Sequence, residues 1–170
     1  MFRSVDPSKG EAYRLGGVML VTSLAIIGTA LAFEHIGGYI PCHLCLLQRW
    51  AYYGSIPALF LAMVLAGEMP RVSAALFALV ALAFLGNAGL AVYHAGVEWK
   101  FWPGPQTCIG TATLPQTAGD LLSGMERDVV PCDEAQWRFF GLSFAGWNVF
   151  ICLALASLGA KAARAAADRR

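Results

Sequence analysis

Two cysteines separated by two residues, Cys42 and Cys45, lie where the chain enters a long apolar stretch. Residues three and four apart share one face of an α-helix, so a helix here would align Cys42, Cys45 and Arg49. The unpaired N–H groups of a first helical turn and the nearby guanidinium both favour a thiolate over a thiol. The spacing therefore predicts a redox-active pair with a nucleophilic sulfur.

The Cys-x-x-Cys pattern also occurs in zinc sites, haem attachment sites and thioredoxin-type sites. Leu46 follows Cys45 where haem attachment needs a histidine, and no βαβ pattern surrounds the pair as it would in a thioredoxin fold. Arginine is rare inside an apolar segment unless it has a functional role. The alternative is that the side chain of Arg49 extends to the lipid head groups. His43 lies on a different helix face and is expected to be interfacial.

Three further cysteines follow, Cys108 and Cys132 in the longest polar region and Cys152 in an apolar stretch. A disulfide within Cys-x-x-Cys closes too short a loop to stabilise the fold much, so its use is expected to be chemical. The wide spacing of Cys108 and Cys132, with no histidine nearby, disfavours zinc. We interpret the two pairs as two redox-active disulfides that exchange with each other. Four cysteines permit three pairings, and a purely structural disulfide between Cys108 and Cys132 is the alternative. Cys152 is expected to be an inert, buried filler.

The composition indicates a membrane protein. Of 170 residues, 58% are hydrophobic and 14% are charged, whereas soluble domains average about 45–50% apolar and about 25% charged residues. The formal net charge is +1, which argues against nucleic acid as a partner. The lipid bilayer is the expected partner of most of the surface.

Four stretches are long and apolar enough to span about 30 Å of hydrocarbon. They cover about residues 15–33, 44–66, 72–93 and 142–160. Runs of this length are helical in lipid, because a helix satisfies its own backbone hydrogen bonds. The prediction is an all-α, four-transmembrane-helix bundle that forms one integral membrane domain over residues 1–170. Cleavage of the first stretch as a secretory signal is the alternative, but that stretch is longer than the usual signal core.

Basic residues give the orientation of the bundle. Most of them precede the first stretch, join the second to the third or follow the fourth: Arg3, Lys9, Arg14, Arg71, Lys161, Arg164, Arg169 and Arg170. By the positive-inside rule both termini are cytoplasmic. The loops at residues 34–43 and 94–141 then face outward, where disulfides persist. A short amphipathic helix on the membrane surface is predicted from Leu121 to Val130.

His94 lies at the outer end of the third stretch, on the same side of the bilayer as Arg49. Two interpretations stay open for it. It is either an interfacial residue without a special role, or it helps Arg49 to polarise a bound electron acceptor. On the predicted helix, Cys45 is the deeper cysteine of its pair.

Three motifs resemble a known family. They are Pro-Cys-x-x-Cys with a following arginine at residues 41–49, Trp-Pro-x-Pro-x-Thr-Cys at residues 102–108, and Cys132 followed by Gln136-Trp137 and Phe140-Gly141-Leu142. Together with four spans, they make the sequence resemble the DsbB family of bacterial membrane thiol:quinone oxidoreductases over most of its length.

The resemblance implies a direction for the electrons. A periplasmic thioredoxin-fold oxidase of the DsbA type would arrive reduced and form a mixed disulfide with Cys108. Cys132 would then exchange with Cys42, and Cys45 would pass an electron pair to ubiquinone or menaquinone in a bacterial inner membrane. The redox-active disulfides would be Cys42–Cys45 and Cys108–Cys132.

The resemblance also implies roles for two other residues. Arg49 matches the arginine that the family places beside the quinone, where its cation would stabilise the Cys45 thiolate and the developing quinol anion. His94 matches the family histidine with a spacing to the loop cysteine that differs by one residue. No metal site is expected.

Two other functions fit part of the pattern. A quinone-linked reductase that resembles vitamin K epoxide reductases would carry its loop cysteines before the Cys-x-x-Cys pair, whereas here they follow it. A non-catalytic membrane scaffold stapled by disulfides would gain nothing from Arg49 beneath Cys45. The position of Arg49 therefore favours an enzyme.

Overall fold

The computed structural model describes residues 7–105 and 132–168, which form four long helices and one small hairpin. The helices are α1 (Pro7–His35), α2 (His43–Leu65), α3 (Pro70–Glu98) and α5 (Phe144–Ala167). The hairpin, β1 (Arg138–Phe139) and β2 (Leu142–Ser143), directly precedes α5. Cys108 and the amphipathic helix predicted at residues 121–130 lie outside the described residues.

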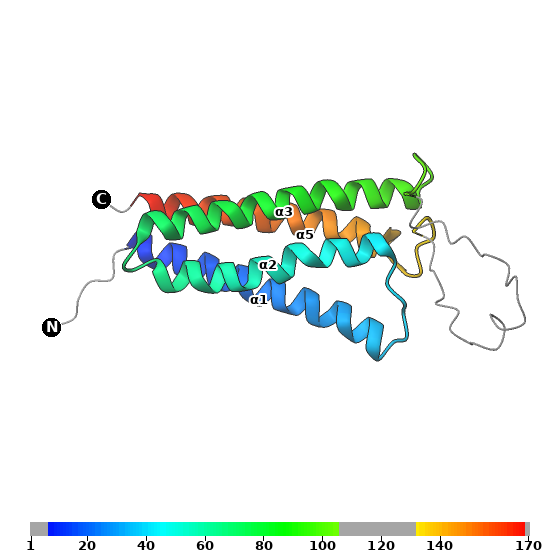
Figure 1. Ribbon diagram of the computed structural model, residues 1–170, viewed down its shortest axis with the longest axis horizontal. Helices are drawn as coiled ribbons and strands as arrows, with labels where there is room; N and C mark the ends of the chain where they lie inside the picture. Colours follow the sequence, from blue (N-terminus) through cyan, green and yellow to red (C-terminus); the bar gives the residue numbers. More distant parts are fainter. Residues whose placement is uncertain (1–6, 106–131, 169–170) are drawn as a thin grey trace, which may run out of the picture.

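The four helices run along the long axis of the molecule, and α1 diverges from α2 at the end where their connection lies (Figure 1). α3 packs most extensively against α5, α2 packs against α1 and α3, and α1 also contacts α5. Glycine permits close contact between helices in two places. A Cβ at Gly16 would lie 2.8 Å from Cγ of Met63, and one at Gly159 would lie 3.0 Å from Cβ of Ala81. Small residues at such crossings are typical of membrane helices.

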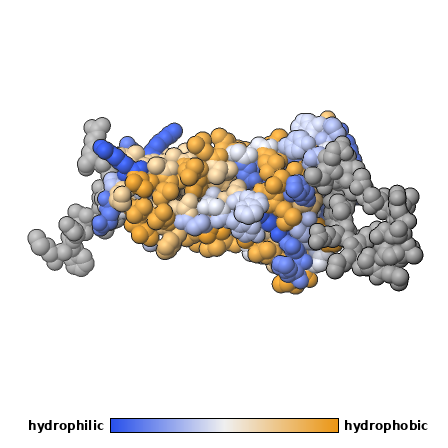
Figure 2. Space-filling model, viewed as in Figure 1, coloured by the Kyte–Doolittle hydropathy of each residue, from blue (hydrophilic) through white to orange (hydrophobic). Residues whose placement is uncertain are grey.

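Three helices of the described chain are long and apolar enough to cross a membrane, namely Gly10–His35, α3 and α5. α2 has 23 residues, but Gln48 and Arg49 lower its hydropathy. Hydrophobic side chains cover most of the visible face between the two ends of the bundle (Figure 2). Large exposed apolar residues occur on every helix, for example Val21, Phe60, Leu82 and Phe150. An apolar surface of this extent is suited to lipid, so the chain is a mostly helical membrane protein.

The helices coincide with the four predicted stretches but are longer in three cases, since α5 also continues past residue 160 to Ala167. α1 begins at Pro7 and not near residue 15, and α3 continues to Glu98, one turn past the predicted end at Tyr93. Hydropathy marks apolar residues, whereas a helix continues for as long as each N–H finds the carbonyl four residues back. The added turn of α3 places His94 and Glu98 on one helix face.

The hairpin fixes the start of α5. Its strands are antiparallel and are joined by Phe140 and Gly141, whose φ angles are +50° and +81°. Two successive residues with positive φ form the tight turn that suits a two-residue hairpin loop. Ser143 then caps α5, because its Oγ accepts a hydrogen bond from the N–H of Gly146 at 3.2 Å. The hydroxyl of Ser143 also donates to the carboxylate of Glu98, which joins α5 to the end of α3.

Candidate active site

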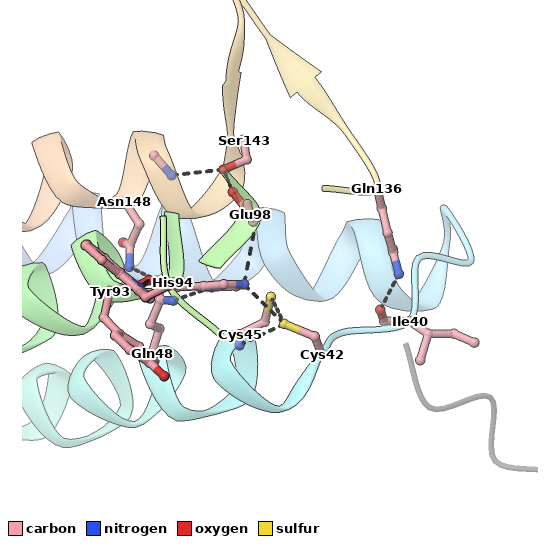
Figure 3. Close-up of polar contacts among 12 residues, drawn as sticks. Ile40, Cys42, Cys45, Gln48, Tyr93, His94, Glu98, Gln136, Ser143 and Asn148 are labelled. Atoms are coloured by element: carbon pink, nitrogen blue, oxygen red, sulfur yellow. Dashed lines mark hydrogen bonds and ion pairs between the residues drawn. The ribbon is translucent and has the colours of Figure 1, made fainter. Parts of the chain in front are cut away.

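Cys42 and Cys45 lie at the N-terminal end of α2 as free thiols. Cys42 is the N-cap residue, with an extended backbone (φ −71°, ψ 167°), and its Sγ accepts a hydrogen bond from the N–H of Cys45 at 3.3 Å. The two Sγ atoms are 2.8 Å apart. Sγ of Cys42 is also 3.5 Å from Nε2 of His94 on α3. Two sulfurs and one imidazole therefore meet where α2 begins (Figure 3).

These contacts stabilise a thiolate at Cys42, which lies outside α2. The hydrogen bond with Cys45 is the largest influence and lowers the pKa of Cys42, burial opposes it, and the hydrogen bond with His94 lowers it further. The net effect is a pKa well below the usual range of a thiol. In the reduced pair, Cys42 is thus the sulfur that ionises first, with the S–H of Cys45 as its donor.

The lowered pKa predicts how the thiol responds to acid. Cys42 stays ionised until the pH falls through its lowered pKa, so alkylation of Cys42 by iodoacetamide should be nearly constant from about pH 8 to about pH 6. An ordinary thiol, with a pKa of about 8.5, loses about tenfold in thiolate per pH unit over this range. Mass spectrometry of the Cys42 peptide measures the rate, with free cysteine in the same tube as control. A parallel decline of the two rates would show that the fold does not stabilise the thiolate.

His94 is 2% exposed, so it lies inside the bundle and not at the interface. Its Nδ1 is 2.8 Å from Nε2 of Gln48 on α2. Its Nε2 is 3.7 Å from Oε1 of Glu98, one turn later on α3. Both ring nitrogens therefore face polar groups, and the orientation of the imidazole toward Cys42 is fixed from two sides.

Arg49 lies on α2 one turn below Cys45, and its guanidinium forms an ion pair with Glu34 of α1. Both side chains are largely shielded, with 13% and 26% of their surface exposed. Arg49 and Cys45 line the same cavity. The guanidinium predicted beneath Cys45 is thus paired with a carboxylate from another helix, and does not extend unpaired into the head-group region.

A cavity of about 220 Å³ lies beside the two sulfurs, between α1, α2 and α5. Its polar side includes Cys42, Cys45, Arg49 and His94. Much of the remaining wall is apolar and includes Ile26, Ile27, Phe33, Phe144, Trp147 and Ile151. An apolar pocket with a few convergent polar groups is the usual form of a small-molecule site. This one suits a planar, apolar ring that carries carbonyl oxygens.

Cys132 is buried in the same small cluster of packed side chains as Cys42. It is disulfide-bonded. Four residues after it, Nε2 of Gln136 donates a hydrogen bond to the carbonyl of Ile40 at 2.9 Å. The chain after Cys132 is thus tied to the chain just before Cys42. The structure brings three of the four predicted redox cysteines together, and Cys108 is the one outside the described residues.

The ligand atoms of Cys42, Cys45 and His94 all lie within 4.8 Å of one another, a spacing that a metal ion could bridge. Thiolate and imidazole are ligands that zinc and copper(I) accept. The same three atoms form the redox pair and its imidazole neighbour. A metal ion held there would therefore block thiol–disulfide exchange.

Four residues of the site were not identified from the sequence: Gln48, Tyr52, Glu98 and Asn148. The amides of Gln48 and Asn148 were detectable as polar side chains within apolar helices, which in membranes is a sign of function. Glu98 was detectable as the residue four positions after His94.

His43 and Cys152 lie outside the group of residues that meet at the sulfurs. His43 is exposed, as expected for an interfacial residue. Cys152 is fully buried, but it accepts a hydrogen bond from Asn87 at 3.3 Å and lies 3.5 Å from the hydroxyl of Tyr52. It is thus part of a polar cluster inside the bundle and more than an apolar filler.

Comparisons with known proteins identify relatives over most of the chain. The family model for disulfide bond formation protein DsbB matches residues 13–162. A disulfide bond formation protein B from Haemophilus influenzae is 31% identical over 140 residues, which cover 79% of this chain and 76% of the relative. One from Marinobacter nauticus is 29% identical over 84% of this chain and 86% of its own length, and one from Escherichia coli K12 is 27% identical over 81% and 77%. All residues of the site described above lie within the matched range.

Proposed function

Because the chain belongs to the DsbB family of disulfide bond formation proteins, we propose that it re-oxidises a periplasmic, DsbA-like dithiol protein and passes the electrons to a membrane quinone. The observation that carries this proposal is the position of Cys42 and Cys45 in the wall of a largely apolar cavity. Redox-active sulfurs beside such a cavity have access to an acceptor that is dissolved in lipid.

The cavity fits a quinone by its chemistry. A quinone supplies an acceptor for two electrons and two protons, and its ring is planar and apolar. The apolar walls from α1 and α5 would hold the ring, with Arg49 and His94 near its oxygen atoms. A guanidinium in a site shielded from water stabilises negative charge as it develops on oxygen.

The proposed electron route uses four cysteines. A thiolate of the partner attacks Cys108 and breaks a Cys108–Cys132 disulfide, so that Cys132 leaves as a thiolate. Cys132 attacks the sulfur of Cys42, which breaks the Cys42–Cys45 bond and leaves the electron pair on Cys45. The partner's second thiolate then attacks its own sulfur in the mixed disulfide, which completes the partner's disulfide and releases Cys108. Cys108 attacks Cys132, which re-forms the Cys108–Cys132 disulfide and releases Cys42 as a thiolate. Cys45 would pass an electron pair to the quinone as the Cys42–Cys45 bond re-forms. The net change is one disulfide formed in the partner and one quinone reduced, with both protons supplied by the partner's thiols.

The packing of Cys132 with Cys42 supports the middle step of this route, because exchange between disulfides needs the attacking sulfur close to its target. The lowered pKa of Cys42 supports the later return step, because a thiol with a low pKa is the better leaving group when the Cys42–Cys132 bond is broken again.

A reconstituted reaction tests the proposal. The full-length protein in vesicles is supplied with ubiquinone or menaquinone and a reduced thioredoxin-fold dithiol protein, and the quinone absorbance is followed. Catalytic loss of quinone absorbance with matched oxidation of the partner is expected. A membrane scaffold would give no turnover.

We further propose that α2 is a fourth membrane span in a single domain of the bacterial inner membrane. Its 23 residues extend over about 34 Å, enough to cross the hydrocarbon. α2 is flanked by α1 and α3, which both qualify as spans. The start of α1, the connection between α2 and α3, and the end of α5 lie together at one end of the bundle, opposite the connection between α1 and α2 (Figure 1). Cytoplasmic termini and periplasmic cysteine loops are supported by the basic residues in those segments, namely Arg14, Arg71, Lys161 and Arg164.

Arg49→Ala is expected to raise the KM for quinone by about tenfold or more, the usual effect of losing a hydrogen bond from a charged group. Glu34→Gln keeps the size of the paired side chain but removes its charge, so the KM should not rise. Steady-state quinone reduction measures both. Arg164→Ala at the opposite end of the bundle is the matched control and should leave the KM unchanged. An unchanged KM in Arg49→Ala would make Arg49 a structural partner of Glu34 alone.

A further inference from the structure

A continuous series of side-chain hydrogen bonds leads from the sulfurs into the bundle (Figure 3). Sγ of Cys42 lies 3.5 Å from Nε2 of His94, whose Nδ1 lies 2.8 Å from Nε2 of Gln48. Oε1 of Gln48 accepts a hydrogen bond from Nδ2 of Asn148 at 2.6 Å. Oδ1 of Asn148 accepts one from the hydroxyl of Tyr52 at 2.5 Å. Residues of α2, α3 and α5 thus form one amide chain between a phenol and an imidazole.

The amide chain has a direction. An amide has one end that accepts and one end that donates. Asn148 accepts from Tyr52 with its oxygen and so offers its nitrogen to Gln48. Gln48 accepts with its oxygen and so offers its nitrogen to His94. Because an N–H of Gln48 points at Nδ1, that ring nitrogen is the acceptor, and the proton of the neutral imidazole lies on Nε2.

The deep end of the chain holds this direction in place. The thiol of Cys152 donates to Oδ1 of Asn148 at 3.4 Å, in addition to the bond from Tyr52. Nδ2 of Asn87 donates to the sulfur of Cys152 at 3.3 Å. A reversed chain would turn the nitrogen of Asn148 toward Tyr52 and Cys152, so the hydroxyl of Tyr52 and the thiol of Cys152 would lose the oxygen that accepts from both. The observed direction is therefore the more stable one.

We propose that Asn148 and Tyr52 are positioning residues that hold His94 in its Nε2–H tautomer, through Gln48. Nε2–H then points at Sγ of Cys42, 3.5 Å away, and is available to the Cys42 thiolate. The other tautomer would present a bare nitrogen to the sulfur and would repel the thiolate. The inference rests on the proposed function for its biological meaning, but the tautomer can be measured without turnover.

Other groups also act on this imidazole. Glu98 of α3 lies 3.7 Å from Nε2 and is an alternative acceptor of the same proton. Titratable or charged side chains lie around His94 directly, through Glu98 or through the shared cavity: Cys42, Cys45, Glu98, Arg138, Glu34, Arg49, Tyr39, Tyr52 and Glu134. None of them contacts Nδ1 in the described part of the chain, where Gln48 is the recorded partner.

The test measures ring-nitrogen protonation directly. Full-length protein labelled with ¹⁵N-histidine is reconstituted in vesicles at neutral pH, and nitrogen NMR separates bare from protonated ring nitrogens. His35→Gln and His43→Gln assign the three histidines of the chain. The native protein is expected to show His94 with a bare Nδ1 and a protonated Nε2. A protonated Nδ1 in the native protein overturns the proposal.

Two variants test the named residues. In Asn148→Asp the carboxylate cannot donate, so Gln48 should turn its nitrogen toward it and present its oxygen to Nδ1. The expected result is loss of the bare Nδ1 signal of His94. Tyr52→Phe keeps the ring but removes the donor, and both tautomers should then be populated. Ser157→Ala, a change on the exposed face of α5, is the matched control and should leave the spectrum unchanged.

The NMR results test the positioning role of Asn148 and Tyr52 independently of whether the protein reduces quinone. An unchanged His94 signal in folded Asn148→Asp and Tyr52→Phe overturns the positioning role, whatever the turnover. If Asn148→Asp fails to fold, Tyr52→Phe alone decides, because it deletes a single oxygen. A tautomer that changes as expected in a protein that never reduces quinone would support the inference and refute the proposed function.

Discussion

Cys45→Ser is expected to abolish quinone reduction by a dithiol partner, with a fall of at least about a thousandfold, as is typical when a nucleophile is removed. Cys45 lies in the cavity wall and, in the proposed route, holds the electron pair that leaves for the quinone. A serine hydroxyl neither forms a disulfide nor gives up two electrons. Quinone absorbance with reduced partner in excess measures the loss.

Formation of a mixed disulfide shows whether the Cys45→Ser variant is folded. The exchange steps before Cys45 do not need its sulfur, so the variant should still form a mixed disulfide with the partner, visible on a non-reducing gel. Capture of the partner without turnover would show a folded protein that is blocked at the last step. Undiminished quinone reduction would remove Cys45 from the electron route.

Cys132→Ser is expected to separate two activities. Turnover with the protein partner should fall by about a thousandfold or more, because the sulfur that exchanges with Cys42 is gone. Turnover with dithiothreitol should stay within about twofold, because a small dithiol reduces the Cys42–Cys45 disulfide directly. Quinone absorbance with each reductant in turn measures both rates.

This comparison also tests the alternative in which Cys132 belongs to a structural staple. Loss of a staple would weaken the fold and reduce both activities together, with a lower melting temperature. Equal activity with both reductants would show that Cys132 takes no part in the electron route. A relay predicts a third result: loss of turnover with the protein partner while turnover with dithiothreitol is kept.

The sequence predicted well those features that lie on a single helix. The start of α2 was placed within one residue, and the common face of Cys42, Cys45 and Arg49 follows from helix geometry alone. The partners of these side chains across helices were not predictable. Glu34 reaches Arg49 from α1, and no periodicity within α2 contains that information.

The depth of His94 shows a second limit. Hydropathy ends the third span near Tyr93, because the next residues are polar or small, yet α3 continues for one more turn. The packing of that turn against the hairpin and α2 buries both His94 and Glu98. Burial of a polar side chain depends on what covers it, which a linear pattern does not record.

The hydrogen bond from Gln136 to the carbonyl of Ile40, and the packing of Cys132 with Cys42, have a kinetic consequence. Tethered groups held in contact react as if each were present at a very high local concentration, up to about 10⁵ M or more when well oriented. In the proposed route, the internal exchange between these two sulfurs would therefore be a first-order event that dilution does not slow. The concentration dependence of turnover would then come from collision with the dithiol partner in the aqueous compartment and from arrival of the oxidant through the lipid.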